Sequence, residues 1–169
     1  VVPTMDDLER EIGKCDDRAH LHLVNQRCAA VPIEPVAVLA DWRPDGLTVW
    51  ATFQAPHHLR NYLATWLDIP QIQCRVIAPD VGGGFGAKIV WYPEFFLAPL
   101  LSKWTRRPVK FCQTRTEAMM QMTHGRDQVH DIDVGFMKDG TIKALRLVVS
   151  QNLGAYALSL IHIRRCRRR

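Results

Sequence analysis

A short run of glycines is the part of this sequence that is best suited to chemistry. Four of the ten glycines in the 169-residue chain fall within five positions, at Gly82, Gly83, Gly84 and Gly86. A single glycine is enough for a tight turn that needs a positive φ. Glycines also free backbone N–H groups and remove the Cβ atoms that block close approach. The run therefore predicts that a bulky, polar, anionic group lies against bare backbone.

The same glycines partly match two phosphate-binding motifs. Gly82, Gly84 and Ala87 fit the G-x-G-x-x-A fingerprint of dinucleotide-binding folds, after a predicted strand and before a predicted helix. The acidic residue expected about 20 positions later is missing from the sequence. An NAD(P)-binding dehydrogenase therefore stays only as an alternative. A P-loop is excluded, because Ile89 rather than Ser or Thr follows Lys88.

The distribution of charge argues against a nucleic-acid-binding domain. The formal net charge is +5, but five of the 22 basic residues lie in the last six positions: Arg164, Arg165, Arg167, Arg168 and Arg169. The other basic residues balance the 17 acidic ones. Nucleic-acid-binding domains carry basic residues across a folded face, so we expect no nucleic-acid partner. A basic-tailed adaptor that binds nucleic acid through residues 158–169 stays as a second alternative.

The cysteines and the apolar runs bear on the cellular setting. Five cysteines stand at positions 15, 28, 74, 112 and 166, and none forms a CxxC pair typical of zinc or redox sites. We expect reduced, mostly buried thiols in a cytoplasmic protein. No apolar run reaches the roughly 18 residues that a membrane span needs. His20 and His22 share one strand face, but a third metal ligand is lacking nearby in the sequence.

The elements that must position the glycine run alternate between helix and strand. Periodicity and capping signals predict helices at 5–14, 56–67, 92–104 and 114–122, and extended segments at 20–24, 35–41, 47–53, 73–78 and 108–112. A hairpin is expected at 129–136 and 141–149, with Asp131 and Asp133 on a wet face. The fold class is therefore α+β, with mixed sheets and packed helices.

Seven sequence blocks, taken together, resemble a known family. In chain order they are Gln54 to Arg60, Arg75 to Lys88, Tyr92 to Glu94, Arg107 to Lys110, Thr114 to Glu117, His124 to Gln128 and Gly154 to Tyr156. They make the chain similar to the large, molybdenum-binding subunit of the molybdenum hydroxylases, which include xanthine dehydrogenase, aldehyde oxidase and aerobic carbon monoxide dehydrogenase. The resemblance implies a partial molybdopterin-binding domain at 25–157, after a lead-in segment at 1–24 and before the basic tail at 158–169.

The resemblance also implies roles for individual residues. Gln54 matches the glutamine whose amide donates to an oxo ligand of molybdenum, and Phe85 matches the aromatic residue beside the metal. Gly83, Gly84 and Gly86 match backbone that contacts the molybdenum–molybdopterin cofactor. No direct metal ligand and no catalytic residue are expected within this chain, because the family's proton-abstracting glutamate lies outside the matching region.

The remaining implications concern the whole enzyme. The family oxidises a small substrate, of the aldehyde, heterocycle or carbon monoxide type, with oxygen taken from water. Electrons pass to an iron–sulfur subunit with 2Fe-2S centres and to an FAD subunit, and the parent is expected to be a dimer of heterotrimers. The pterin can carry a cytosine dinucleotide. Ile89 stands where xanthine dehydrogenase has a glutamate, which disfavours purines, and Lys88 is expected to neutralise a cofactor phosphate or to lie on the surface.

Overall fold

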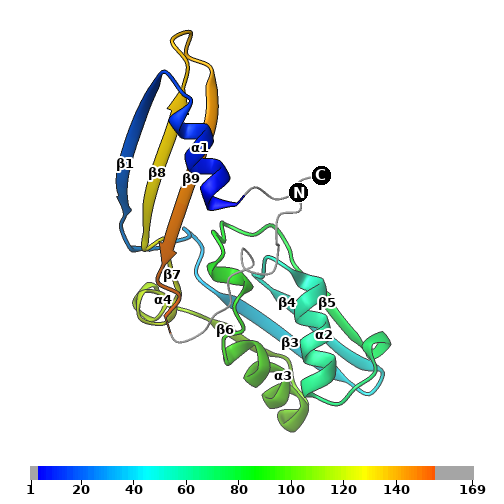
Figure 1. Ribbon diagram of the computed structural model, residues 1–169. Helices are drawn as coiled ribbons and strands as arrows, with labels where there is room; N and C mark the ends of the chain where they lie inside the picture. Colours follow the sequence, from blue (N-terminus) through cyan, green and yellow to red (C-terminus); the bar gives the residue numbers. More distant parts are fainter. Residues whose placement is uncertain (1–3, 155–169) are drawn as a thin grey trace. The chain divides into compact units, whose positions relative to one another are not determined.

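The computed structural model describes residues 4–154 and divides the chain into two compact units (Figure 1). One unit comprises residues 29–125, and the other combines residues 1–28 with residues 126–169. The expected domain boundaries at 24/25 and 157/158 stay a prediction. The basic tail at 158–169 lies outside the described residues, as does Tyr156 of the last sequence block.

A four-stranded mixed sheet forms the base of the unit at 29–125. Its strands are β3 (Ala37–Arg43), β4 (Gly46–Ala51), β5 (Cys74–Ile77) and β6 (Val109–Cys112), in the order β5-β4-β3-β6. β3 runs antiparallel to β4 and to β6, whereas β4 and β5 are parallel, with Trp50 opposite Ile77. Alternate residues of β4 are buried, as expected of a sheet with one face on the core.

Two helices cover that face and enclose the core. α2 (Pro56–Trp66) starts with proline in its first turn, where the missing N–H costs nothing, and buries Leu59 and Leu63. α3 (Glu94–Thr105) buries Phe95, whose ring packs edge-on against Phe53 at a centroid distance of 5.1 Å. α4 (Arg115–Gln121) begins at the predicted capping box. The three helices and the four strands predicted for this region are therefore confirmed. The fourth predicted helix, near the N-terminus, is also present and belongs to the other unit.

The second unit is a three-stranded antiparallel sheet with one helix on it. Its strands are β1 (Asp17–Asn25), β8 (Gln128–Phe136) and β9 (Ile142–Gln151), in the order β1-β8-β9, and α1 (Met5–Gly13) packs on β8 and β9 (Figure 1). The predicted hairpin is confirmed. Gly135 leaves room for α1 and the residues that follow it, because a Cβ there would lie 2.6 Å from Cys15 Sγ and 3.4 Å from Ile12 Cα.

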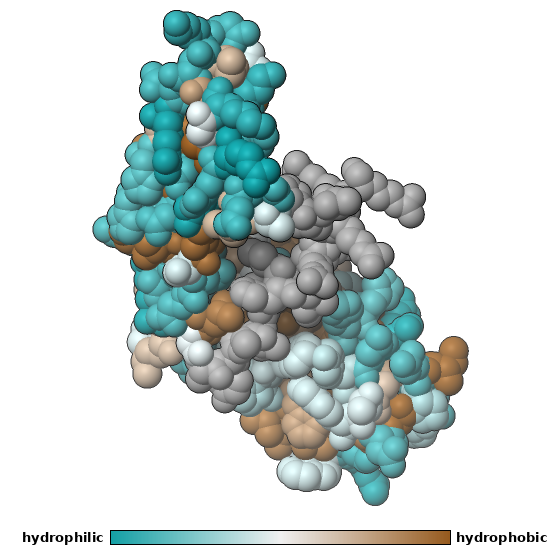
Figure 2. Space-filling model, in the orientation of Figure 1, coloured by the Kyte–Doolittle hydropathy of each residue, from teal (hydrophilic) through white to brown (hydrophobic). Residues whose placement is uncertain are grey.

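The two faces of this three-stranded sheet differ in polarity. The face that carries α1 is mostly hydrophilic (Figure 2). On the opposite face Leu21, Ile132 and Leu147 lie side by side across the three strands, and both leucines are about half exposed. We call this surface the open apolar face; it also includes Leu23, Leu145 and Val149.

Two expectations about side chains are wrong. Asp133 was expected to face solvent, but it is buried. It lies on the face of the sheet that carries α1, where it accepts a hydrogen bond from Arg18 Nη2 at 2.7 Å. The thiols are not mostly buried either, since Cys28 and Cys112 are exposed and only Cys74 is fully buried among the described cysteines. Burial raises the pKa of the Cys74 thiol.

Several short elements were not predicted. They are the paired strands β2 (Cys28–Ala29) and β7 (His124–Gly125), and the 3₁₀ turns η1 (Gln71–Gln73) and η2 (Ala87–Ile89). The α+β class is confirmed. No described helix is long and apolar enough to cross a membrane.

Candidate functional site

The parallel pairing of β4 and β5 positions the glycine turn beside Gln54. Gln54 follows the end of β4, and the turn at 82–86 follows the end of β5. Adjacent parallel strands end at the same edge of a sheet. The two segments, far apart in sequence, therefore leave the sheet together and meet.

The side chain of Gln54 has a defined orientation. Its Oε1 accepts hydrogen bonds from the backbone N–H of Gly86 at 3.0 Å and of Lys88 at 3.1 Å. Because both partners are donors, the atom that faces them must be the carbonyl oxygen. The amide Nε2 is therefore not the atom that contacts these two N–H groups, and within residues 4–154 it has no hydrogen-bond partner. An exposed N–H₂ group is left available beside Gly86.

Two of the four glycines make room for protein side chains. A Cβ at Gly84 would lie 2.5 Å from Gln54 Cδ, and one at Gly82 would lie 2.6 Å from Glu34 Cβ. Both distances are shorter than real Cβ contacts allow. Gly82 and Gly84 therefore permit the close packing that fixes the turn, and the predicted contact of the glycines with a ligand stays a prediction.

The other two glycines and the aromatic residue between them adopt left-handed conformations. Gly83 has φ +94° and Gly86 has φ +83°, which glycine adopts without strain. Around a Cβ built at Gly86 the described part of the chain leaves open space. Phe85 has φ +52°, an uncommon value for a side chain of its size, and is 75% exposed. The turn thus presents an exposed aromatic ring at Phe85 and open space beside the backbone of Gly86.

Lys88 occupies neither of its expected places. Its side chain is 0% exposed, and Nζ donates to Glu34 Oε2 at 2.7 Å. The prediction that it binds a cofactor phosphate or lies on the surface is wrong, because it is buried in an ion pair. Partial burial pushes the pKa of Glu34 upward, but the hydrogen bonds from Lys88 and Gly82 outweigh this and lower it. Glu34 was not predicted, since nothing near it in sequence signals a partner 54 positions away.

The segment after the turn argues against a dinucleotide site. Tyr92 donates its hydroxyl hydrogen to the carbonyl of Ala87 at 2.9 Å, and burial raises the pKa of this phenol. The turn leads into the short 3₁₀ turn η2, and α3 begins only at Glu94, so the turn does not lead directly into the N-terminus of an α-helix. The dinucleotide fingerprint requires that junction, because the pyrophosphate lies on the helix N-terminus.

The paired histidines bind carboxylates. His20 Nδ1 lies 3.0 Å from Asp133 Oδ1, and His22 Nδ1 lies 2.6 Å from Asp131 Oδ1. The part of the chain that the structure describes holds no cluster of three or more potential metal ligands. Cross-strand pairing therefore accounts for both imidazoles.

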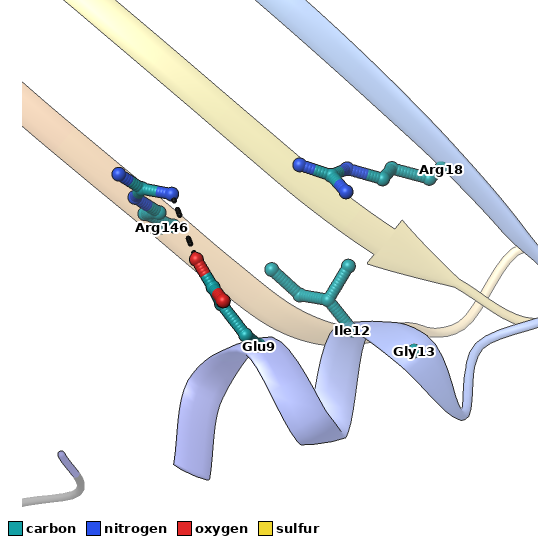
Figure 3. A pocket seen from close by; sticks show the side chains of 5 residues that line it. All are labelled: Glu9, Ile12, Gly13, Arg18 and Arg146. Atoms are coloured by element: carbon teal, nitrogen blue, oxygen red, sulfur yellow. Dashed lines mark hydrogen bonds and ion pairs between the residues drawn. The ribbon is translucent and has the colours of Figure 1, made fainter. Parts of the chain in front are cut away.

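A hollow of about 300 Å³ lies between α1 and the sheet, in the other unit from the glycine turn (Figure 3). Arg18 and Arg146 approach it from the strands, and Glu9 and Ile12 from the helix. Arg146 contacts Glu9 at 3.4 Å, and Arg18 is paired with Asp133. Because the two guanidinium groups already face two carboxylates, this hollow offers little net attraction to an anion.

A comparison of the sequence with known protein families identifies the family of this chain. The model of the family described as the molybdopterin cofactor-binding domain matches residues 2–166. The chain belongs to this family. The resemblance inferred from the seven blocks is thereby confirmed, and Gln54 and the glycine turn both lie within the matched region.

Relatives of this molybdopterin-binding chain include several oxidoreductase subunits. The nicotine 6-hydroxylase large subunit of Paenarthrobacter nicotinovorans is 36% identical over 132 residues, which are 77% of this chain and 16% of that protein. The putative xanthine dehydrogenase molybdenum-binding subunit XdhA of Escherichia coli is 39% identical over 153 residues, 89% of this chain and 20% of that protein. Quinoline 2-oxidoreductase from Pseudomonas putida 86 has a similar fold, with a TM-score of 0.76 and 30% identity over 88% of this chain and 19% of that one. The chain thus spans about a fifth of the length of these relatives.

Proposed function

We propose that this chain is the part of a molybdenum-dependent hydroxylase subunit that holds one side of the molybdopterin centre. The observation that carries the proposal is the fixed amide of Gln54. Two backbone N–H groups anchor its oxygen and leave its N–H₂ group exposed next to the open backbone of Gly86. Family membership supports the identity of the cofactor.

The residues present fit such a cofactor. An uncharged amide can donate to a metal–oxo group without competing as a strong ligand. Gly86 lacks a Cβ and faces open space, so a large flat group can approach its backbone. Gln54, Gly83, Gly84, Phe85 and Gly86 are the residues that would hold the centre. No residue of this chain is proposed as a metal ligand or as a catalytic base.

The bound cofactor would supply the oxidation chemistry, with oxygen taken from water. Gln54 would contribute oriented N–H donors at a position that costs no reorganisation, because its oxygen is already anchored. Phe85 would narrow the approach to the centre and exclude bulk water, since its ring is exposed on the same turn. Gly83 and Gly84 would set the conformation that brings these groups together.

The substrate is proposed to be a small molecule of the aldehyde, heterocycle or carbon monoxide type. The names of two relatives, which refer to nicotine and quinoline, support the heterocycle class. Ile89 offers no hydrogen bond to a purine, which disfavours purines. A substrate panel that compares quinoline-type, aldehyde and purine substrates would separate these classes, and purine turnover as the fastest reaction would contradict this assignment.

The electron partners are proposed from the family. An iron–sulfur subunit with 2Fe-2S centres and an FAD subunit would take the electrons away, within a dimer of heterotrimers. One relative is named as a subunit of a dehydrogenase complex, which supports a multisubunit parent. The cytosine dinucleotide form of the pterin and a cytoplasmic location stay predictions.

The decisive experiment measures cofactor content and then tests Gln54. Protein purified from its native host should contain molybdenum and pterin in near-stoichiometric amounts, measured by elemental analysis and pterin fluorescence. Gln54→Glu keeps an oxygen for Gly86 and Lys88 but replaces the donor with an acceptor. We expect turnover to fall about 100-fold, the usual cost of removing an oriented donor.

Gln71→Glu, in the exposed turn η1, is the matched control and should leave turnover unchanged. Absence of molybdenum and pterin from the wild-type protein would refute the proposed function. Equal turnover of Gln54→Glu and the wild type would show that Gln54 has no role at the site.

A further inference from the structure

We propose that Glu34 and Lys88 are positioning residues that preset the glycine turn before any cofactor binds. The purpose of such a preset turn rests on the proposed function. Whether the turn is ordered can nevertheless be measured without cofactor. The pair differs from the residues that would face the centre, because the Lys88 side chain is fully buried and its ammonium group is paired with Glu34. Its role would be to connect the two ends of the turn into one rigid unit.

Glu34 holds the first end of the turn. Its Oε2 accepts a hydrogen bond from Gly82 N at 2.8 Å as well as the one from Lys88 Nζ at 2.7 Å. The backbone adds a further link, from Glu34 N to the carbonyl of Gly82 at 3.2 Å. The close approach of Gly82 to Glu34 leaves no room for a Cβ. One carboxylate oxygen thus fixes a backbone amide and an ammonium group together.

Lys88 carries this constraint to the second end of the turn. Its backbone N–H donates to Gln54 Oε1 at 3.1 Å, and its carbonyl accepts from Gln54 N at 3.0 Å. Gln54 Oε1 also accepts from Gly86 N. Lys88 is therefore the one residue among these that is bonded both to Glu34, through its side chain, and to Gln54, through its backbone.

The segment that carries Glu34 is itself held in place. Arg115, the first residue of α4, donates from Nη2 to the carbonyls of Pro32 and Ile33, both at 2.7 Å. Pro32 is fully buried. Glu34 therefore extends from a braced segment, and its carboxylate can act as a fixed point for the turn.

The burial of a full charge at Lys88 needs a reason beyond packing. An apolar pair of similar volume usually gives equal or better stability than a buried ion pair. An ion pair differs from an apolar pair by fixing direction, since its hydrogen bonds require defined geometry. The turn needs such directional control, because Gln54 must present its N–H₂ group on one side only.

The test uses hydrogen–deuterium exchange followed by mass spectrometry, in a peptide covering residues 79–88. The full chain is produced in a host that makes no molybdopterin. Lys88→Met removes the ammonium group, and the double variant Glu34→Gln, Lys88→Met also removes the partly buried carboxylate that would otherwise lose its ion-pair partner. Asp41→Asn is the matched control, since Asp41 accepts from Arg43 within the same unit and makes no hydrogen bond to the turn within residues 4–154.

A positioning role predicts that the peptide exchanges about tenfold faster or more in both variants, as expected when a buried donor or acceptor loses its partner. The double variant should regain most of the global stability, measured by tryptophan fluorescence, without regaining the slow exchange. Asp41→Asn should exchange like the wild type. In cofactor-loaded protein, molybdenum content should fall several-fold in both variants.

Other outcomes would overturn the proposal. If the double variant regains wild-type exchange together with its stability, the pair contributes to stability only. If neither variant folds, the pair is a requirement for folding and not a positioning device. A wild-type protein without molybdenum would refute the proposed function while leaving the exchange result on turn order intact, so the two failures can be told apart.

Discussion

The two units of the chain bury apolar surface to very different degrees. In the unit at 29–125 the sheet, α2 and α3 enclose one continuous core, in which Val49, Leu59, Leu63 and Phe95 are all fully buried. In the other unit Ile12 and Ala144 are the buried hydrophobic residues among those that the structure describes, and each is 6% exposed. Its open apolar face instead leaves large side chains about half exposed.

The candidate site lies entirely on the well-packed unit. A turn can hold backbone in left-handed conformations, such as that of Phe85, only where its surroundings determine it strongly. The continuous core of the unit at 29–125 includes Val49 of β4 and Cys74 of β5, the strand that the turn follows. Left-handed backbone is not confined to this unit, because Arg126 and Asp127 of the other unit also have positive φ values, +68° and +60°. The units therefore differ in how much apolar surface they bury, and the following predictions test that difference.

The largest effect is expected in the core of the unit at 29–125. Phe95→Ala should lower the free energy of unfolding by roughly 3–5 kcal/mol, because it removes a buried ring that packs on Phe53. All five tryptophans of the chain lie within this unit, so denaturant unfolding followed by tryptophan fluorescence reports on it selectively. A loss below about 1 kcal/mol would contradict the comparison.

Gly84→Ala should have the next largest effect. The new Cβ would overlap Gln54, whose side chain must move, at a cost of about 1–3 kcal/mol, and molybdenum content should fall with it. Gly13→Ala, at the end of α1 in the other unit, is the control, since a Cβ there meets nothing within 4 Å. That variant should be neutral or slightly stabilising. Unchanged stability and molybdenum content in Gly84→Ala would show that Gln54 is not held as described.

The two capping boxes allow the units to be compared with the same chemistry. Thr114 caps α4 and Thr4 caps α1, each by accepting from the backbone N–H of N3. Thr114→Ala should lower the stability of the unit at 29–125 by about 1 kcal/mol, and tryptophan fluorescence should detect it. Thr4→Ala should shift the loss of helical circular dichroism while leaving the tryptophan transition in place. Coincident shifts in both signals would mean that the units unfold together.

Acid should weaken the unit at 29–125 through Glu34. Its pKa is lowered in the folded chain from an ordinary value of 4.5. Its stabilising contribution is therefore complete above the unfolded pKa and is lost as the pH falls through the folded pKa. Stability measured by tryptophan fluorescence should drop as the pH falls below about 4.5, and Glu34→Gln should flatten that drop. An identical pH profile in the variant would assign the acid sensitivity to other carboxylates.

The smallest effect is expected on the open apolar face. Leu147→Thr should change the free energy of unfolding by no more than about 0.5 kcal/mol, because Leu147 is half exposed and threonine suits a strand. The matched change Leu59→Thr, in the core of the other unit, should cost several times more. Thermal unfolding of both variants, followed by circular dichroism, makes this comparison directly. A large loss in Leu147→Thr would show that this face is covered in the folded protein.

Local signals predicted most of the elements but few of the contacts. Capping boxes, turn residues and alternation lie within a few positions of each other, so helices such as α4 and the hairpin of β8 and β9 could be located from the sequence. The parallel pairing of β4 with β5 joins segments that share no local signal. The burial of Lys88 and Asp133 depends on Glu34 and Arg18, which are remote in sequence.

The site was predictable only in part. The glycine run indicated a close approach to backbone, and the resemblance to a family linked it to Gln54, which the structure places against the turn. The residue-level roles toward the cofactor stay predictions. The sequence could not predict that Gly82 and Gly84 make room for Glu34 and Gln54. A glycine looks the same in a sequence whether a ligand or a neighbouring side chain fills the space beside it.

The parallel pairing of β4 and β5 has a consequence for how this protein can vary. Everything between the two strands, α2 included, forms a connection that starts and returns at fixed ends of the sheet. Gln54 stands at the start of this connection, three residues after β4. Insertions or deletions in α2 or between α2 and β5 would therefore leave the separation between Gln54 and the glycine turn unchanged, because the neighbouring strands set it. Homologues can thus change the outer surface over α2 while the contact between Gln54 and the turn stays constant.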